Sequence, residues 1–233
     1  FGFTAYHQPG SLAGEGRKSY ANGGSSDVFY DSSLDELTQS DVSVSAGGPI
    51  IEDKLFFYGI INPRASKDYY STGNTRFAST NNMREQKASG GDNLFWGSKI
   101  DWDIADGHRL SLFGYSDRRD VTERNWRYNA QTGVVGVETG GFVRARGGDV
   151  MSANYVGNLT EDLTVSALWG NIETQYTDTP AITNCPSVAD NRTSGQPKAV
   201  QCGSGGTIGV DYDDNTQIRL DVEYNLEFYG NHI

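Results

Sequence analysis

The stretch that decides the fold is QIRLDVEYNLEF, residues 217–228, in which polar and apolar side chains alternate without a break. Successive side chains of a β-strand point to opposite faces, so a period of two predicts a strand with one polar and one apolar face. The polar face would carry Arg219, Asp221 and Glu223, and the apolar face Leu220, Val222, Tyr224 and Leu226.

The same period of two recurs along the chain, whereas helical periodicity is almost absent. In segment 93–103, Trp96, Ile100 and Trp102 alternate with Lys99, Asp101 and Asp103, and segment 163–170 places Trp169 on its apolar side. The pattern predicts an all-β fold with eight strands, at 1–6, 42–47, 54–62, 93–103, 108–117, 151–159, 163–170 and 217–228.

Short and long connections alternate between these strands. The short ones are 48–53, 104–107, 160–162 and 229–232, and the long, polar ones are 9–41, 63–92, 118–148 and 173–215. An antiparallel meander collects alternate connections at opposite ends, which predicts one end of tight turns and one end of large loops. This asymmetry is typical of transmembrane β-barrels, with short periplasmic turns and long extracellular loops.

The clearest runs have eleven or twelve residues, which suits a membrane strand of about 9–11 residues. On this interpretation the polar set faces the lumen: Lys99, Asp101, Asp103, Arg219, Asp221 and Glu223. The lipid-facing set is Trp96, Ile100, Trp102, Trp169, Leu220, Val222, Tyr224 and Leu226. A soluble β-sandwich produces the same alternation, so a secreted binding module, for example for carbohydrate, stays open as an alternative.

Charge and composition limit the class of protein further. The chain has 233 residues and a net charge of −11, which excludes a basic nucleic-acid binder. Its longest nearly apolar run, 55–61, is too short for a membrane-spanning helix. Cys185 and Cys202 flank a Gly/Ser/Pro-rich stretch, which predicts a loop disulfide and an oxidising compartment.

Both ends of the sequence look like cuts through a larger object. The chain begins inside an alternating run at Phe1 and stops just after the turn-like Gly230-Asn231-His232. Four loops of about thirty residues are also more than an eight-stranded barrel usually carries. We therefore expect residues 1–233 to be a partial β-barrel domain.

Three segments resemble TonB-dependent outer-membrane receptors of the Oar-like kind, which carry a carboxypeptidase-regulatory-like N-terminal domain. The most specific is GGPIIEDKLFFYG at 47–59, and FGFTAY at 1–6 and YNLE at 224–227 are similar to strands of that family. The resemblance implies a bacterial outer-membrane barrel of about 22 strands with a plug domain that lies outside this chain. It also implies the TonB–ExbB–ExbD energy-coupling complex as a partner, and a scarce small solute or peptide as cargo.

No residues form a convincing catalytic or cofactor site, so we expect a transporter and not an enzyme. His7, His108 and His232 lie at strand ends or turns, without a Ser or Cys nucleophile and an orienting third group. Asp211, Asp213 and Asp214 are a weak candidate for a loop calcium ion. They lack the Gly and distal Glu of an EF-hand, so a solvated acidic loop is the simpler interpretation. A non-transporting structural barrel is the third class left open.

The third long connection has the most distinctive composition. Arg124, Trp126, Arg127 and Tyr128 together would suit an anionic ligand or the phosphates of lipopolysaccharide. The competing interpretation is internal pairing of the arginines with carboxylates of the same region, at Asp117, Asp120, Glu123 and Glu138.

Overall fold

The computed structural model describes residues 1–20, 28–72, 82–181, 188–190, 198–200 and 208–226. Within these ranges the fold is all-β and antiparallel, with one 3-10 turn at Gly10–Leu12. No described helix is long and apolar enough to cross a membrane. The strands are β1 (Gly2–Gln8), β2 (Lys18–Tyr20), β3 (Val28–Asp31), β4 (Glu36–Ile51), β5 (Leu55–Thr72), β6 (Asn82–Ala105), β7 (His108–Ser116), β8 (Arg119–Asn129), β9 (Val134–Arg146), β10 (Gly148–Asn158), β11 (Leu163–Pro180), β12 (Val188–Asp190), β13 (Lys198–Val200) and β14 (Gly209–Tyr224).

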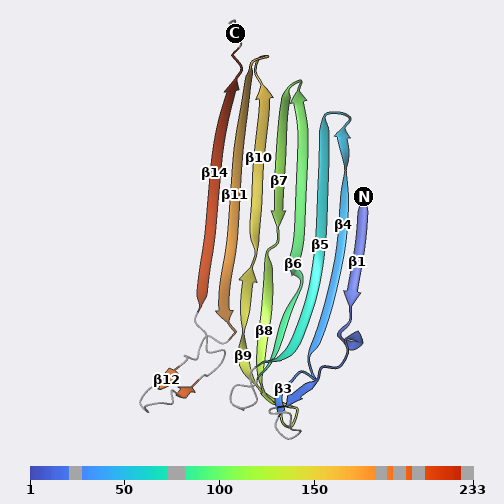
Figure 1. Cartoon of the computed structure of the whole chain (residues 1–233), viewed down its shortest axis with the longest axis vertical. Helices are drawn as coiled ribbons and strands as arrows, with labels where there is room; N and C mark the ends of the chain where they lie inside the picture. The colour runs from blue at the N-terminus through green and yellow to red at the C-terminus, as the bar shows by residue number, and fades with distance from the viewer. Residues whose placement is uncertain (21–27, 73–81, 182–187, 191–197, 201–207, 227–233) are drawn as a thin grey trace, which may run out of the picture.

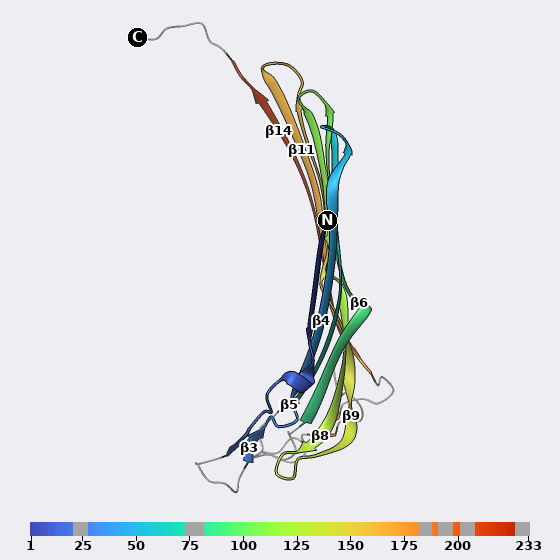
Figure 2. The ribbon, with the colours of Figure 1, turned by 90° about the vertical axis from the view of Figure 1, so that its right-hand side faces the viewer.

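One large sheet organises the molecule. Eight of its ten strands lie side by side in the order β1-β4-β5-β6-β7-β10-β11-β14, and β1 and β14 lie at the two edges of this row (Figure 1). The other two, β8 and β9, pair with each other, with β6 and with β11. Seen from the side, these strands form a single gently curved layer (Figure 2). All eight predicted strands are present in this sheet, so the all-β, antiparallel part of the prediction is confirmed.

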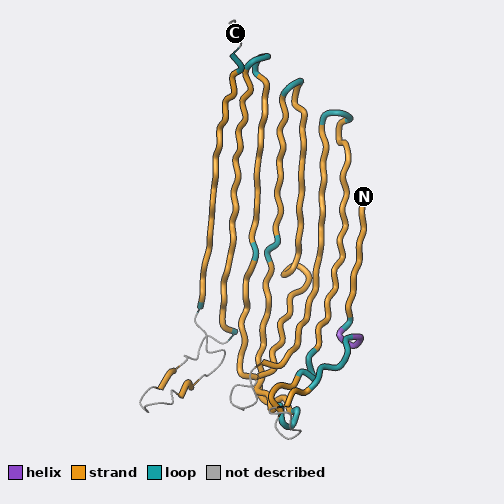
Figure 3. Tube along the Cα trace, viewed as in Figure 1, coloured by secondary structure: helices purple, strands orange, loops and turns teal. Residues whose placement is uncertain are grey.

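Tight turns join the strands at one end of the sheet, at the top of Figure 3. The β4–β5 turn contains Asp53 with a φ of 58°, and the β6–β7 turn contains Gly107 with a φ of 76°. Both angles lie in the left-handed region that suits turn residues. Three predicted short turns are confirmed, and the fourth, at 229–232, lies outside the described residues.

The prediction of long polar loops was wrong in extent, because much of each loop is strand. Segment 118–148 forms the hairpin β8–β9, β5 continues to Thr72, and β14 begins at Gly209. In these outer segments polar residues occupy many positions on both faces, so the strict alternation used to find strands is lost although the ladder pairing continues.

The hairpin β8–β9 extends two strands of the main sheet beyond an interruption. β8 pairs with the outer part of β6, and β9 with the outer part of β11, where β7 and β10 have ended. At the break, Gly147 has a φ of 84°, and Asp117 accepts a hydrogen bond of 2.8 Å from the amide of Gly148. A Cβ at Gly147 would collide with the backbone of Asp117. This glycine therefore permits the change of direction.

Candidate functional site

The pairing register gathers the apolar side chains of eight strands on one face of the sheet, here called the apolar face. Directly paired residues share a face, and one such row contains only Leu55, Trp102, Leu110, Tyr155, Ala167 and Leu220. The residues predicted to face lipid lie on it, from Trp96 to Tyr224, except Leu226, which follows the end of β14.

This face is uncovered within the described part of the chain. Leu220 is 67% exposed, and even Trp102 in the middle of the sheet is 42% exposed. The only other described sheets are the two-stranded pairs β2–β3 and β12–β13. Leu, Val and Trp side chains in such an arrangement require a nonpolar environment that the described residues do not supply.

The opposite face, here called the polar face, carries every residue predicted to line the lumen. Asp101 accepts a hydrogen bond from Ser111 at 2.7 Å and pairs with Lys99 at 2.9 Å. Arg219 pairs with Asp221 at 2.7 Å. Aromatic residues such as Phe113 are interspersed among these ions, so the face is mixed.

The apolar band crosses the strands obliquely. A single row of directly paired residues contains Phe3, Val44, Ile61 and Trp96 on the first four strands. The same row continues as Ser116, Asp149, Glu173 and Asp214 on the last four. If the band were perpendicular to the strands, a row of directly paired residues would be apolar on all eight strands or polar on all eight. The change from apolar to polar along this row shows that the band crosses the strands at an angle.

The tilt follows from the register. Toward the long-loop end, the continuous apolar run stops at Ile218 on β14, in the row that contains Gly48 of β4. On β4 itself it stops at Val42, which is paired with Ala5 of β1. The boundary thus moves six residues over seven strand-to-strand steps. With a rise of ~3.3 Å per residue and a strand spacing of ~4.8 Å, the tilt is roughly 30°. Closed barrels have tilts of about 35–45°.

At the long-loop end the outer strand segments enclose a small hydrophobic core. Val28, Met83, Tyr128 and Ala130 are buried there. Tyr69 and Trp126 pack against this cluster and meet edge to face, with ring centroids 6.1 Å apart. Parts of the first three long connections are therefore folded into a body with its own core, here called the outer body.

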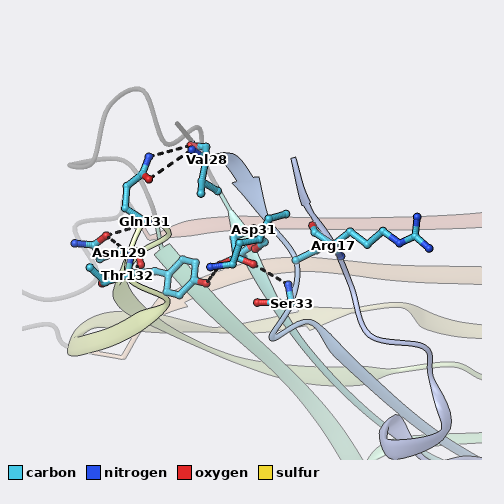
Figure 4. A network of polar contacts seen from close by, with 11 residues as sticks. Arg17, Val28, Asp31, Ser33, Asn129, Gln131 and Thr132 are labelled. Carbon is cyan, nitrogen blue, oxygen red and sulfur yellow. Dashed lines mark hydrogen bonds and ion pairs between the residues drawn. The ribbon is translucent and has the colours of Figure 1, made fainter. Parts of the chain in front are cut away.

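Asp31 is a buried carboxylate of the outer body. Its carboxylate accepts hydrogen bonds from the Tyr128 hydroxyl at 2.6 Å and the Ser33 amide at 3.0 Å, and pairs with Lys18 at 3.1 Å. Figure 4 shows this network beside Gln131, whose side chain bonds the backbone of Val28. Burial alone raises the Asp31 pKa, but the bonds from Ser33, Tyr128 and Lys18 outweigh burial and lower the pKa to about 2.

The four residues predicted as a ligand loop do not form one exposed surface. Arg124 is exposed, pairs with Glu138 at 2.6 Å and lies over the Trp126 ring at 5.3 Å. Arg127 is also exposed, on β8. Tyr128 is 4% exposed and points into the core. Burial of Tyr128 and its bond to Asp31 raise its pKa, so it stays a neutral hydrogen-bond donor.

Most of the other arginines pair with carboxylates of the same region, as the competing interpretation predicted. Glu123 is 1% exposed and lies 3.4 Å from Arg84 and 3.2 Å from Arg144. Arg144 also approaches Asp178, which Arg146 binds at 2.5 Å. Glu123 and Glu138 were predicted partners, whereas Asp178 was not. The arginines of this region thus cross-link β6, β8, β9 and β11.

The weak metal candidate does not form one cluster. Asp211 and Asp213 share the polar face, whereas Asp214 lies on the apolar side, opposite Glu173. The three residues belong to β14 and not to a loop, so the interpretation as an acidic loop was wrong. Asp214 accepts a hydrogen bond from Asn171 at 2.7 Å.

One histidine lies closer to a serine than the sequence indicated. His7 Nδ1 is 2.7 Å from Ser40 Oγ across the β1–β4 ladder. The pair is exposed, and no carboxylate bonds the other ring nitrogen among the described residues. His108 instead lies 2.7 Å from the Tyr155 hydroxyl. Neither arrangement has the oriented third group of a nucleophilic triad.

The described residues define the class of protein: an all-β chain built on one curved antiparallel sheet with an uncovered apolar face. Comparison with protein families, curated protein sequences and solved structures finds no match to this chain. Cys185 and Cys202 lie outside the described residues, so their predicted disulfide stays a prediction.

Proposed function

We propose that the chain is part of the wall of a TonB-dependent receptor that captures a scarce solute at a bacterial outer membrane and imports it through a plugged barrel. The observation that carries this proposal is the oblique apolar band on one face of the sheet. A tilted strand wall in a bilayer requires such a band, because the membrane plane crosses each strand at a different register position.

The dimensions of the band support a bilayer environment. On β5 the apolar side runs from Leu55 to Pro63, which at ~3.3 Å per residue and the tilt derived above is roughly 23 Å tall. Lipid-facing bands of outer-membrane barrels are about 25 Å tall. Across eight strands the band covers roughly 700 Å², more than the largest apolar patch of a typical soluble monomer.

The two ends of the sheet fit two sides of a membrane. The tight turns would lie in the periplasm and the outer body outside the cell, where it would take part in solute capture. The polar face would line the lumen and contact a plug. β1 and β14 each leave one edge unpaired in the described sheet, and further strands of a larger barrel would pair with them.

A secreted β-sandwich is the main rival, and a direct experiment separates the two. We expect the full-length protein to fractionate with the outer membrane, to require detergent for extraction, and to migrate differently on gels with and without boiling. Recovery from the periplasm as a detergent-free monomer would refute the membrane proposal.

Energy coupling needs its own test. In a receptor of this class, solute uptake would stop when TonB is removed, while binding of the solute to the cell surface would persist. Uptake that is unchanged without TonB would instead support a passive or structural barrel.

A further inference from the structure

A wide bulge interrupts β6 where the sheet passes from the apolar band to the outer body, visible as a hook in the β6 trace in Figure 3. Pro63 pairs with Leu94 and Ala65 pairs with Ser89, so the single residue Arg64 of β5 faces four residues of β6, at 90–93. Gly90, with a φ of 63°, allows this bulge. The surplus residues separate the two strands and open space beside Arg64.

Arg64 places its charge in this space, and no carboxylate of the described residues lies within 4 Å of it. Its guanidinium lies over the Phe95 ring at 5.9 Å, which holds the side chain in position. Nε and Nη2 are both buried, and neither has a hydrogen-bond acceptor among the described residues. Asp41, its partner across the β4–β5 ladder, accepts a bond from Asn62 at 2.7 Å. An arginine with two buried, unused donors is costly unless something else binds it.

Asn93 adds a complementary group to the same space. It is 6% exposed, and its Oδ1 has no donor among the described residues. Asn93 and Arg64 line a cavity of about 250 Å³ together with Asp41 and Arg119. Arg119 has no carboxylate within 4 Å in the described part of the chain, so the cavity carries two arginines and one aspartate in a chain of net charge −11.

We propose that this cavity binds a carboxylate that has a hydroxyl or amide N–H beside it. The planar Arg64 guanidinium would bind the carboxylate oxygens through its unused donors, with Arg119 supplying further positive charge. The adjacent hydroxyl or N–H would donate to Asn93 Oδ1. The inference does not depend on the membrane assignment, because the same residues line the cavity in any environment.

The test is calorimetric titration of the full-length protein with malate and with succinate, which lacks only the hydroxyl. We expect malate to bind more tightly than succinate, and Arg64→Gln to weaken malate binding by roughly ten- to a hundredfold. Asn93→Leu should abolish the preference for malate. Arg109→Gln is the matched control, because it removes one positive charge from the polar face near the tight turns, where Arg109 pairs with Asp101 and Asp103.

The carboxylate has two sources, a free solute or another segment of the same protein, and the titration separates them. If a segment of the protein occupies the cavity, the wild type will not bind malate, and Arg64→Gln will lower the thermal midpoint more than Arg109→Gln does. Equal weakening of malate binding by the two substitutions would overturn the proposal. So would the absence of malate binding combined with equal thermal midpoints of all variants.

Discussion

The proposal that the apolar face contacts lipid is tested most sharply by a matched pair of substitutions, Ala167→Arg and Ser166→Arg. The two residues are neighbours on β11, both are small, and both are partly buried. Their side chains point to opposite faces. Ala167 lies between Tyr155 and Leu220 on the apolar face, whereas Ser166 lies between Val156 and Asp221 on the polar face.

The expected magnitude follows from the depth of Ala167. Asn171 is the next polar residue on that face, four positions along β11. At ~3.3 Å per residue and a tilt of 30–40° it lies roughly 11 Å away along the membrane normal, close to half the height of the band. Arginine near the midplane costs about 2–4 kcal/mol in a membrane barrel. Arginine at position 166 would lie opposite Asp221 in a polar environment and change stability by less than about 1 kcal/mol.

The assay is urea unfolding of the full-length protein in lipid vesicles, followed by tryptophan fluorescence and by the boiling-dependent shift on gels. We expect Ala167→Arg to lower the unfolding midpoint and the amount of protein in the outer membrane, and Ser166→Arg to do neither. Equal effects of the two substitutions, or a larger effect of Ser166→Arg, would refute the assignment of the two faces.

Two further predictions concern the long-loop end. The folded-state pKa of Asp31 lies below its ordinary value of 3.8, so the ionised carboxylate stabilises the outer body by roughly 2 kcal/mol above pH 5, and this contribution is lost as pH falls toward 2. Hydrogen exchange should therefore show weaker protection of β3 and β8 at pH 3 than at pH 6. At pH 6, Tyr128→Phe should weaken the protection of β3 and β8 by about 1–3 kcal/mol, whereas substitution of an exposed tyrosine, Tyr58→Phe, should leave it unchanged. Protection that is the same at both pH values and in both variants would contradict a stabilising role of ionised Asp31. Cys185 and Cys202 should resist alkylation until reduced, and two reactive thiols without reductant would exclude the disulfide.

Much of the fold was predictable because the apolar band has a strict period of two. In segment 217–228 every second residue is apolar, and the pairing of β14 with β11 places Leu220 and Val222 beside Ala167 and Val165. The outer strand segments were not predictable in this way. β8 and β9 are solvent-exposed at many positions on both faces, so their sequences lack a strict alternation and the pattern predicts loops there.

The candidate sites were harder to predict, since they depend on residues far apart in the chain. Asp31 and Tyr128 are 97 positions apart, and no local pattern marks either as buried. The residues next to Arg64 in the sequence do not indicate that its guanidinium lacks a carboxylate partner. Its isolation appears only when the β6 bulge, with Gly90 and Asn93, is placed opposite it.

The sequence by itself determined that the chain is all-β and which side chains share a strand face, because alternation is a local property of an extended backbone. Only the tertiary structure decided how the strands are staggered. Register depends on pairing between distant segments, and it alone reveals the oblique apolar band, the interruption at Gly147 and the cavity beside Arg64.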